Sequence, residues 1–333
     1  MAYGLAHLLK ALAIAKGDLP SAHGYALAQF GNAAETMVLQ RATTTGSISG
    51  DDPGLTSLMN EFMPLVARAS VIARINAVSK FRAVPVATRL LKQTVGSSAS
   101  WTQEGGAIPV SDMEFLLAPE MDPLKLTAML VATLDLLRKL GQQADAALQA
   151  DCVRAVAAAE SVAFLDPAAA GVDGVQPPSV TSSAIMIPST GSTDAALAAD
   201  FAALITAYEG SPESAALVMN SADALRLAIV TKANDLGPRG GEYFGVPVIG
   251  SDLAPQGLAT LLDPSSIGLV DAGTNISVGT QATVTVQLPD LSTQLLSLWS
   301  ENLASMRLVR YLNWRVERTG SVVCLSGLFP ATL

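Results

Sequence analysis

The amino-acid sequence predicts a mixed α+β fold, and three observations lead to this prediction. Residues 142–164 form the clearest helical pattern of the chain, residues 193–288 alternate between helical and strand-like segments, and residues 81–119 contain short strand-like runs. At about 100–200 residues per domain, the length of 333 residues corresponds to about two domains or one elaborate domain.

The first part of the chain is predicted to be helical. Apolar residues follow helical spacing from Leu5 to Leu12, and Gly17 supplies a stop. A second helix is expected from Pro20 to Arg41. Residues 43–54 are rich in Thr, Ser, Gly and Asp, which favour turns and do not build a core, so we expect a flexible joint there.

Beyond this joint the pattern changes from helical to strand-like. Residues 55–69 are expected to be helical up to the interruption at Pro64, and residues 71–78 alternate as a strand does. Two further runs, 84–88 and 114–117, are expected to be strands separated by a segment rich in Gly and Ser. Two strands alone bury too little apolar area to be stable in water, so this excursion is expected to lie on another surface.

The helix over 142–164 would be about 35 Å long and is predicted to end at Asp166-Pro167. We predict that one face of it packs closely on a sheet because its residues are small. The residues of this face are Ala144, Leu148, Cys152, Ala155, Ala159 and Ala163. Residues 166–194 are rich in Pro, Gly, Ser and Thr, and we expect them to form a long connection.

The remaining elements alternate between helix and strand, which predicts an α/β-like layer. A glycine-rich tip is expected at 234–245, and a final pair of strands is expected between Trp314 and Leu325, around the turn at Thr319-Gly320. The helices are expected at 195–207 and 223–233, and the strands at 215–219, 246–249, 278–288 and 295–310.

The composition excludes several classes of protein. Half of the residues are hydrophobic and 15% are charged, so either the core is very large or other chains cover much of the surface. The most apolar stretch, 124–140, is interrupted by four charged residues and does not reach the roughly 18 apolar residues of a membrane span. The net charge of −9 argues against a protein that wraps nucleic acid. Two cysteines are too few for a disulfide framework, which favours a reducing, cytosolic place of synthesis.

The residues that enzymes use are scarce. His7 and His23 are the only histidines, and both precede the expected flexible joint, whereas nucleophilic catalysis needs rigid positioning. Phosphate-binding loops, nucleophile elbows and zinc motifs do not occur. We therefore expect no enzyme, no cofactor and no metal. A hydrolase or a small-ligand binding protein stays open as an alternative, which a monomer with a persistent concave pocket would favour.

Four stretches, in the same order, resemble the major capsid proteins of tailed phages, the Hong-Kong-97-type family. Residues 101–112, WTQEGGAIPVSD, are similar to the W-x-x-E-G-x-x-x-P-x-S segment of the family's extended loop. Residues 164–167, FLDP, with Gly171 and Gly174 resemble the end of its spine helix. Residues 215–251 resemble its central domain, where a G-x-P-V strand follows the glycine-rich tip, and residues 307–314 resemble its closing strand.

The resemblance implies a Hong-Kong-97-type fold made of five parts. They are an N-terminal arm with helical segments over 1–80, an extended β-hairpin loop over 81–122, a peripheral domain over 123–192 with the spine helix at 142–164, an axial domain over 193–288, and peripheral-domain strands with the C-terminus over 289–333. The resemblance also implies that the arm and the extended loop reach neighbouring subunits, and that axial tips meet at the capsomer centre.

The same resemblance singles out two sets of residues. Candidates for subunit contacts lie on the extended loop, where Trp101 is expected to anchor on the adjacent chain and the glycines to allow a turn. These candidates are Trp101, Glu104, Gly105, Gly106 and Pro109. Candidates for the tip at the capsomer axis are Asp235, Gly237, Arg239, Gly240 and Gly241.

The implied function is a shell protein without chemistry of its own. Hexamers and pentamers of the chain would enclose double-stranded DNA in a virion capsid that is assembled in the cytoplasm of a bacterial host. Implied partners are a portal protein, a maturation protease and, in some cases, a decoration protein, with no membrane. A related container, such as a gene-transfer particle or an encapsulin-like nanocompartment, stays open because it shares the fold.

Two departures from the family pattern carry expectations. Some members join subunits by an isopeptide bond from a lysine of the extended loop, and residues 93–119 contain no lysine, so we expect an uncrosslinked shell. Some members begin with a scaffolding segment of about a hundred residues, and here the family-like body starts near Leu55. We therefore expect a separate scaffold protein, or a reduced scaffolding role for the first 50 residues.

Overall fold

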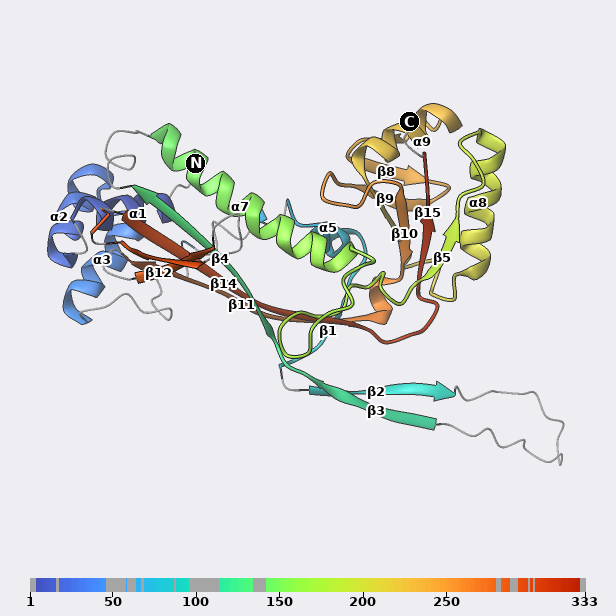
Figure 1. Cartoon of the computed structure of the whole chain (residues 1–333), viewed down its shortest axis with the longest axis horizontal. Coiled ribbons are helices and arrows are strands. Elements are labelled where there is room, and N and C mark those ends of the chain that lie inside the picture. Colours follow the sequence, from blue (N-terminus) through green and yellow to red (C-terminus); the bar gives the residue numbers. More distant parts are fainter. Residues whose placement is uncertain are drawn as a thin grey trace. The chain divides into compact units, whose positions relative to one another are not determined.

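The computed structural model divides into two compact units, each of which is described by itself (Figure 1). The first unit comprises Met1–Arg74, Lys125–Phe164 and Gly273–Tyr311, and the second comprises Ile75–Leu124, Leu165–Ala272 and Leu312–Leu333. The structure describes residues 4–15, 18–45, 58, 64–66, 69–86, 88–95, 114–133, 142–279, 283–287, 293–298, 300–301 and 303–329.

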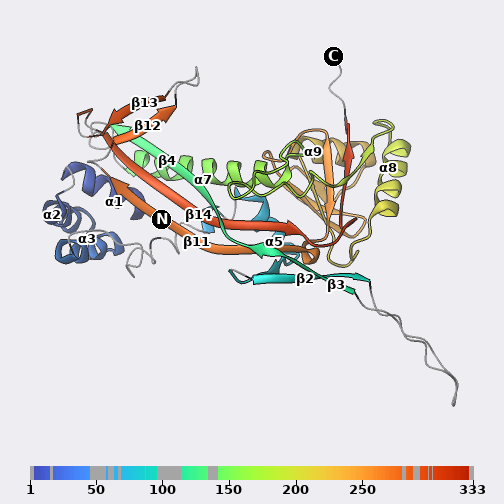
Figure 2. The same cartoon turned by 60° about the horizontal axis from the view of Figure 1, so that its bottom comes forward.

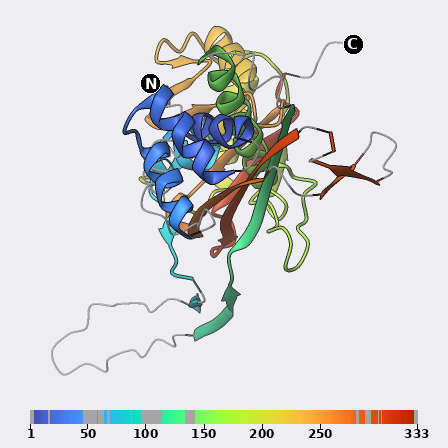
Figure 3. The same ribbon diagram turned by 90° about the vertical axis from the view of Figure 1, so that its left-hand side faces the viewer.

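The first unit contains three N-terminal helices, α1 (Gly4–Ile14), α2 (Leu19–Phe30) and α3 (Ala34–Thr45), which pack on one another (Figure 3). Their apolar faces share a core with the long helix α7 (Gln142–Leu165) and strand β14 (Leu303–Val316). This core includes Leu8, Leu9, Val38, Leu39, Val153 and Leu308. The helices α1, α2 and α3 therefore pack against their own chain.

The single helix predicted from Pro20 to Arg41 is wrong, because the chain forms α2 and α3 instead. Gly31 ends α2 with a positive φ of 66°, which glycine adopts without steric cost, and its N–H donates to the carbonyl of Leu27. Thr43 and Thr44 lie in the last turn of α3 and not in a flexible joint. Their hydroxyls donate to the carbonyls of Gln40 and Arg41 at 2.6 and 2.7 Å. Residues 46–54 of the expected joint lie outside the described residues.

The predicted long helix is confirmed as α7, but its predicted buried face is wrong. Ala155 and Ala159 are exposed, and the side chains of Ala144 and Leu148 lie outside the described part of the helix. The described buried side chains are Cys152, Val153, Val156, Ala157, Glu160, Ser161, Phe164 and Leu165. A helix rich in alanine offers little contrast between its faces. Two polar residues lie on the buried face because Glu160 pairs with Arg310 and the Ser161 hydroxyl accepts a hydrogen bond from the N–H of Val71.

The strand predicted over residues 71–78 is also wrong, because this segment is the helix α5 (Val71–Val78). Val71, Ile72 and Ile75 are buried, a spacing that fits one helical face. Ser70 caps the helix. Its carbonyl accepts a hydrogen bond from the N–H of Arg74 at 3.2 Å, and the Ser70 hydroxyl accepts one from the N–H of Ala73 at 3.4 Å.

A four-stranded sheet has the order β1-β11-β14-β4, with β1 at Arg82–Ala83, β11 at Ile267–Gly279 and β4 at Leu124–Thr133. Two smaller antiparallel pairs are visible in Figure 2. The strand expected at 278–288 is divided between β11 and β12 (Thr283–Gln287). The strand expected at 295–310 is divided between β13 (Thr293–Ser297) and β14. Strand β12 pairs with β13.

The second small pair lies where the sequence predicts a two-stranded excursion, with a different first strand. Strand β2 (Thr88–Val95) pairs with β3 (Glu114–Met121), starting from Thr88 opposite Met121. The first strand begins at Thr88 and not at Val84. Val84 instead follows the short strand β1, and its N–H donates to the carbonyl of Leu269 in β11 at 2.9 Å. Among the described residues, each of these two strands pairs only with the other.

The second unit is built around a seven-stranded sheet with two helices, α8 (Asp194–Ala207) and α9 (Ser221–Thr231). In spatial order its strands are β5 (Ile185–Pro188), β15 (Val322–Ser326), β10 (Leu258–Leu262), β6 (Ala216–Met219), β9 (Val246–Gly250), β8 (Gly240–Tyr243) and β7 (Leu236–Gly237). Every residue of β6 and β10 is buried, as expected for strands in the middle of a covered sheet. Side chains of Thr193 and Asn220 cap the two helices.

The final pair of strands predicted between Trp314 and Leu325 is wrong. The turn exists, with Gly320 at a φ of 76°, but β14 before it and β15 after it belong to different sheets. Strand β15 pairs with β10 and with β5, and β5 lies toward the end of the segment 166–194 that the sequence predicts as a connection. Long-range pairing of this kind leaves no local pattern in the sequence.

No helix in the described part of the chain combines the length and the apolar character that a membrane span requires. The helix α7 has 24 residues, which is long enough, but Asp, Arg and Glu residues interrupt its apolar sequence.

A buried carboxylate in the second unit predicts a specific dependence on pH. Burial would raise the pKa of Asp263, but the hydroxyls of Ser214, Ser265 and Ser266 donate to it at 2.6 Å each and the Ser211 N–H adds a fourth bond, so its pKa lies below the usual value for Asp. A carboxylate with a lowered pKa stabilises the fold above its unfolded pKa and loses that contribution as pH falls. The stability difference between the parent and Asp263→Asn should therefore shrink in thermal melts as pH falls below about 5. A difference that grew with acidity would contradict this assignment.

Candidate assembly surfaces

The five residues expected at the axial tip come together on one hairpin. Strands β7 and β8 pair at the edge of the seven-stranded sheet, with Leu236 opposite Gly241 and Gly237 opposite Gly240. Asp235 precedes the hairpin and Arg239 lies in its turn, and both are exposed. The glycine-rich tip is thus an ordered pair of strands, which continues the sheet through the pairing of β8 with β9.

Glycine is required in this hairpin because the backbone passes very close to its neighbours. Gly240 and Gly241 have φ angles of 101° and 145°, which side chains with a Cβ rarely adopt. A Cβ on Gly240 would lie 2.1 Å from the carbonyl oxygen of Val248, and one on Gly241 would lie 1.9 Å from that of Asp235. Gly237 differs, since its Cβ would meet nothing closer than 3.9 Å.

Sequence reasoning missed one residue of this region, Phe244, in the turn between β8 and β9. Its side chain is 83% exposed and its φ is 50°. The available signal was the dipeptide Phe244-Gly245 between two strands, at a place where Asn-Gly is the usual pair.

The contact candidates of the extended loop, Trp101, Glu104, Gly105, Gly106 and Pro109, lie outside the described residues. The structure describes the strands that flank them, β2 and β3. Val95 at the end of β2 and Glu114 at the start of β3 pair with each other, so the two strand ends that flank residues 96–113 are close together.

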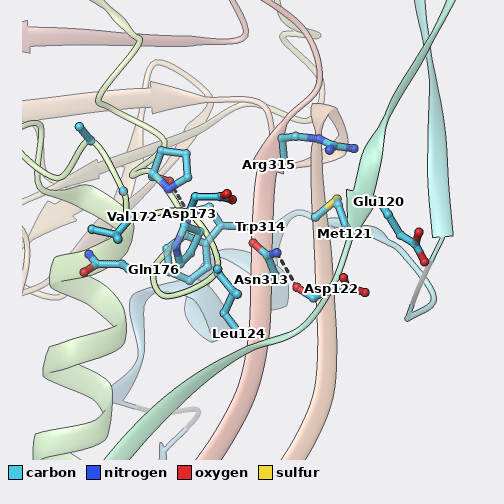
Figure 4. Close-up of a pocket in the computed structure, with 15 residues that line it drawn as sticks. Glu120, Met121, Asp122, Leu124, Val172, Asp173, Gln176, Asn313, Trp314 and Arg315 are labelled. Atoms are coloured by element: carbon cyan, nitrogen blue, oxygen red, sulfur yellow. Dashed lines mark hydrogen bonds between the residues drawn. The ribbon is translucent and has the colours of Figure 1, made fainter.

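A hollow of about 430 Å³ in the second unit is formed by three segments of chain, residues 120–124, 170–178 and 313–315 (Figure 4). The Trp314 ring is buried, and its Nε1 donates to the carbonyl of Pro178 at 2.9 Å. The Asn313 amide donates to the carbonyl of Asp122 at 2.6 Å. Strand β14 thereby holds the 170–178 loop on one side and the β3–β4 turn on the other.

This arrangement predicts the effect of Trp314→Phe. The substitution keeps an aromatic ring but removes the bond to Pro178, so the unfolding free energy should fall by about 1–2 kcal/mol. Amide exchange should accelerate most within residues 170–178. Thermal unfolding and hydrogen exchange measure the two effects. Equal acceleration throughout the second unit would show that the bond does not hold this loop in particular.

The two cysteines and the two histidines lie on four different elements, α7, β15, α1 and α2. Burial raises the pKa of both thiols, Cys152 and Cys324, to about 11, which keeps them protonated near neutral pH. His7 lies in α1, where its Nδ1 is 2.9 Å from Glu35, and His23 lies in α2. Among the residues that the structure describes, no three His, Cys, Asp or Glu side chains gather as metal ligands would.

Comparison with known sequences gives two matches. The model of the phage capsid family matches residues 52–292. The capsid polyprotein of Pseudomonas phage PAJU2 is 32% identical over 310 residues, which cover 86% of this chain and 46% of that protein. The chain thus spans about half the length of this curated relative.

Comparison with solved structures adds likenesses in fold. A structure from Mycobacterium phage Adephagia has a TM-score of 0.58 at 13% identity, and the match covers 78% of this chain and 90% of that one. One from Mycobacterium phage Bobi has a TM-score of 0.57 at 14% identity, with coverage of 78% and 90%. The capsid of a native GTA particle has a TM-score of 0.50 at 14% identity, with coverage of 76% and 89%.

Proposed function

This chain belongs to the phage capsid family and has the α+β fold of Hong-Kong-97-type capsid proteins, and on that premise we propose that it is the major capsid protein of a tailed phage or prophage. Its copies would assemble as hexamers and pentamers into an icosahedral shell that encloses double-stranded DNA. The single observation that carries this proposal is the family match over residues 52–292. Assembly itself is the function, and no bond of a substrate is made or broken.

The proposal assigns a role in the shell to each part of the chain. Residues 193–288 would be the axial domain, with the β7–β8 hairpin at the capsomer axis. Residues 123–192 and 289–333 would make the peripheral domain around α7. Residues 1–80 would be the N-terminal arm, and the extended loop of residues 81–122 would contact a neighbour through Trp101, Glu104, Gly105, Gly106 and Pro109.

The proposal also names partners and a location. A portal protein would occupy one vertex, a separate scaffold protein and a maturation protease would act during assembly, and a decoration protein could bind the finished shell. DNA would be enclosed without sequence-specific contact, consistent with a net charge of −9, which disfavours tight binding of phosphates. The shell would form in the host bacterial cytoplasm and remain as the capsid of the virion.

Expression of the full chain in a bacterial cytosol tests the proposal. Sedimentation and electron microscopy of the lysate should show closed shells, or rings of five and six subunits, with or without co-expression of the neighbouring genes. A monomer that does not assemble even with its genomic neighbours would contradict the proposal. Particles that carry only protein cargo would favour a nanocompartment.

The absence of lysine from residues 93–119 predicts a shell without covalent crosslinks from this loop. Particles that are boiled in denaturant should release the chain as a single monomer band on a gel, without bands at multiples of its mass. Ladders of dimers and higher multiples that persist under reducing conditions would contradict this prediction. The variant Gln103→Lys is the matched control, because it places an amine on this loop without removing a charge. Its particles and those of the parent are compared on the same gel.

A further inference from the structure

The turn between β8 and β9 contains an aromatic residue where the backbone disfavours it. Tyr243 and Val246 pair across the hairpin, so the turn consists of Phe244 and Gly245, whose φ angles are 50° and 79°. A two-residue turn with both φ angles positive is type I′, and Asn-Gly is its preferred sequence. A bulky residue with a positive φ is strained, because its Cβ crowds the backbone.

Burial within the chain does not compensate for this strain. The Phe244 side chain is 83% exposed, more than any other exposed large hydrophobic residue in the described part of the chain. The ring is nevertheless held in place by a neighbouring ring, because the centroids of the Phe244 and Tyr243 rings are 4.6 Å apart. Tyr243 is itself buried, and its ring centroid lies 5.1 Å from that of Phe201 in α8. An aromatic side chain that is strained, exposed and already held in one conformation has the properties of an interface anchor in the unbound protein.

A complementary surface lies on α9 of the same unit. Leu225 and Ile229, one helical turn apart, are 44% and 69% exposed and form an apolar ridge. The buried residues Ala224 and Leu227 of α9 share a core with Tyr243, and with 3.6 residues per turn Leu225 and Ile229 face away from that buried side. The ridge therefore points away from the Tyr243–Phe244 pair of its own chain.

The charges beside the two surfaces have opposite signs. Glu242, exposed, lies two residues before Phe244. Arg226, whose side chain is 56% exposed, lies beside Leu225 and three residues before Ile229, and its Nη1 is 3.9 Å from the buried Asp223 carboxylate of the same helix. An acidic group next to the aromatic side chain and a basic group next to the ridge would attract each other across a contact between two copies.

We propose that Phe244 of one copy docks on the Leu225–Ile229 ridge of a second copy of this chain, with Glu242 of the first facing Arg226 of the second. The proposal rests on the proposed function, in which identical copies meet around a capsomer. Because the two surfaces are different parts of one unit, the contact is head-to-tail, and head-to-tail contacts close into rings when the rotation between copies allows it.

The variant Phe244→Asn separates assembly from folding. It places the preferred residue in a type I′ turn, so thermal melting of the unassembled chain should stay at the parent temperature or rise. The concentration at which shells or rings form should rise about tenfold or more, because the anchor is lost. The conservative variant Phe244→Leu, which keeps an apolar side chain, should assemble at a concentration between the two.

A charge exchange identifies the docking surface. Glu242→Arg and Arg226→Glu should each raise the assembly concentration, and the double variant should return it to within about threefold of the parent. If Phe244→Asn assembles as the parent does, the anchor is overturned. If the double variant assembles no better than the singles, the ridge is overturned as the partner surface. A parent chain that never assembles would contradict the proposed function itself, and only that outcome does so.

Discussion

Replacing Arg310 by methionine is expected to lower the unfolding free energy by about 3–5 kcal/mol, one of the two largest effects that we expect. Arg310 Nη1 lies 2.7 Å from Glu160 Oε2, and the two side chains are 7% and 0% exposed. The other carboxylate oxygen of Glu160 accepts a hydrogen bond from the Ser70 hydroxyl at 2.7 Å. Methionine fills the space of the arginine stem but leaves a carboxylate buried without its counter-charge, which is costly. Denaturant unfolding of the unassembled chain measures the loss.

Two control variants isolate the buried charge as the cause. The double variant Glu160→Leu with Arg310→Met removes both charges and should recover most of the lost stability, because apolar pairs of similar volume often replace buried ion pairs without loss. Arg154→Met breaks the pair of Arg154 with Asp151, which are 73% and 61% exposed, and should change stability by less than about 0.5 kcal/mol. If Arg310→Met were as mild as Arg154→Met, the ion pair would not stabilise the packing of α7 on β14.

Replacing Gly240 by alanine is expected to prevent the β7–β8 hairpin from forming as it does in the parent. Alanine must adopt a φ of 101°, and its Cβ would lie 2.1 Å from the carbonyl oxygen of Val248. Relief requires β8 to move away from β9, so the cost should reach about 3 kcal/mol or more. Chemical denaturation should show this loss, and hydrogen exchange should place it in residues 236–250. Shell assembly should decline as well if this hairpin lies at the capsomer axis.

Gly237 provides the matched control for Gly240, on the same hairpin. It does not have a positive φ, and the nearest atom to an added Cβ is 3.9 Å away. Gly237→Ala should therefore change stability by less than about 1 kcal/mol. Similar losses for the two variants would show that the hairpin tolerates a Cβ at either position, and that the close approach at Gly240 does not matter.

Some elements can be predicted because their pattern is local. The helix α7, the helices α8 and α9, and the strands β6 and β9 each have an apolar spacing or a continuous apolar run that one segment carries by itself. The glycines of 237–241 are recognisable as a special segment for the same reason, although they lie in paired strands and not in a loop. Short segments such as 71–78 are ambiguous, because helix and strand patterns coincide over so few residues.

The sequence by itself determined the family, the α+β class and the long helix, because each depends on short motifs or local periodicity; the axial tip at residues 235–241 stays a prediction. Only the tertiary structure decided which face of α7 is buried, that β14 and β15 enter different sheets, and that Phe244 is exposed in a strained turn. These features depend on partners distant in the chain: Glu160 meets Arg310 across 150 residues, and β15 pairs with β5 more than 130 residues before it. Local propensity contains no information about such partners, since burial and charge pairing are set when the segments pack together.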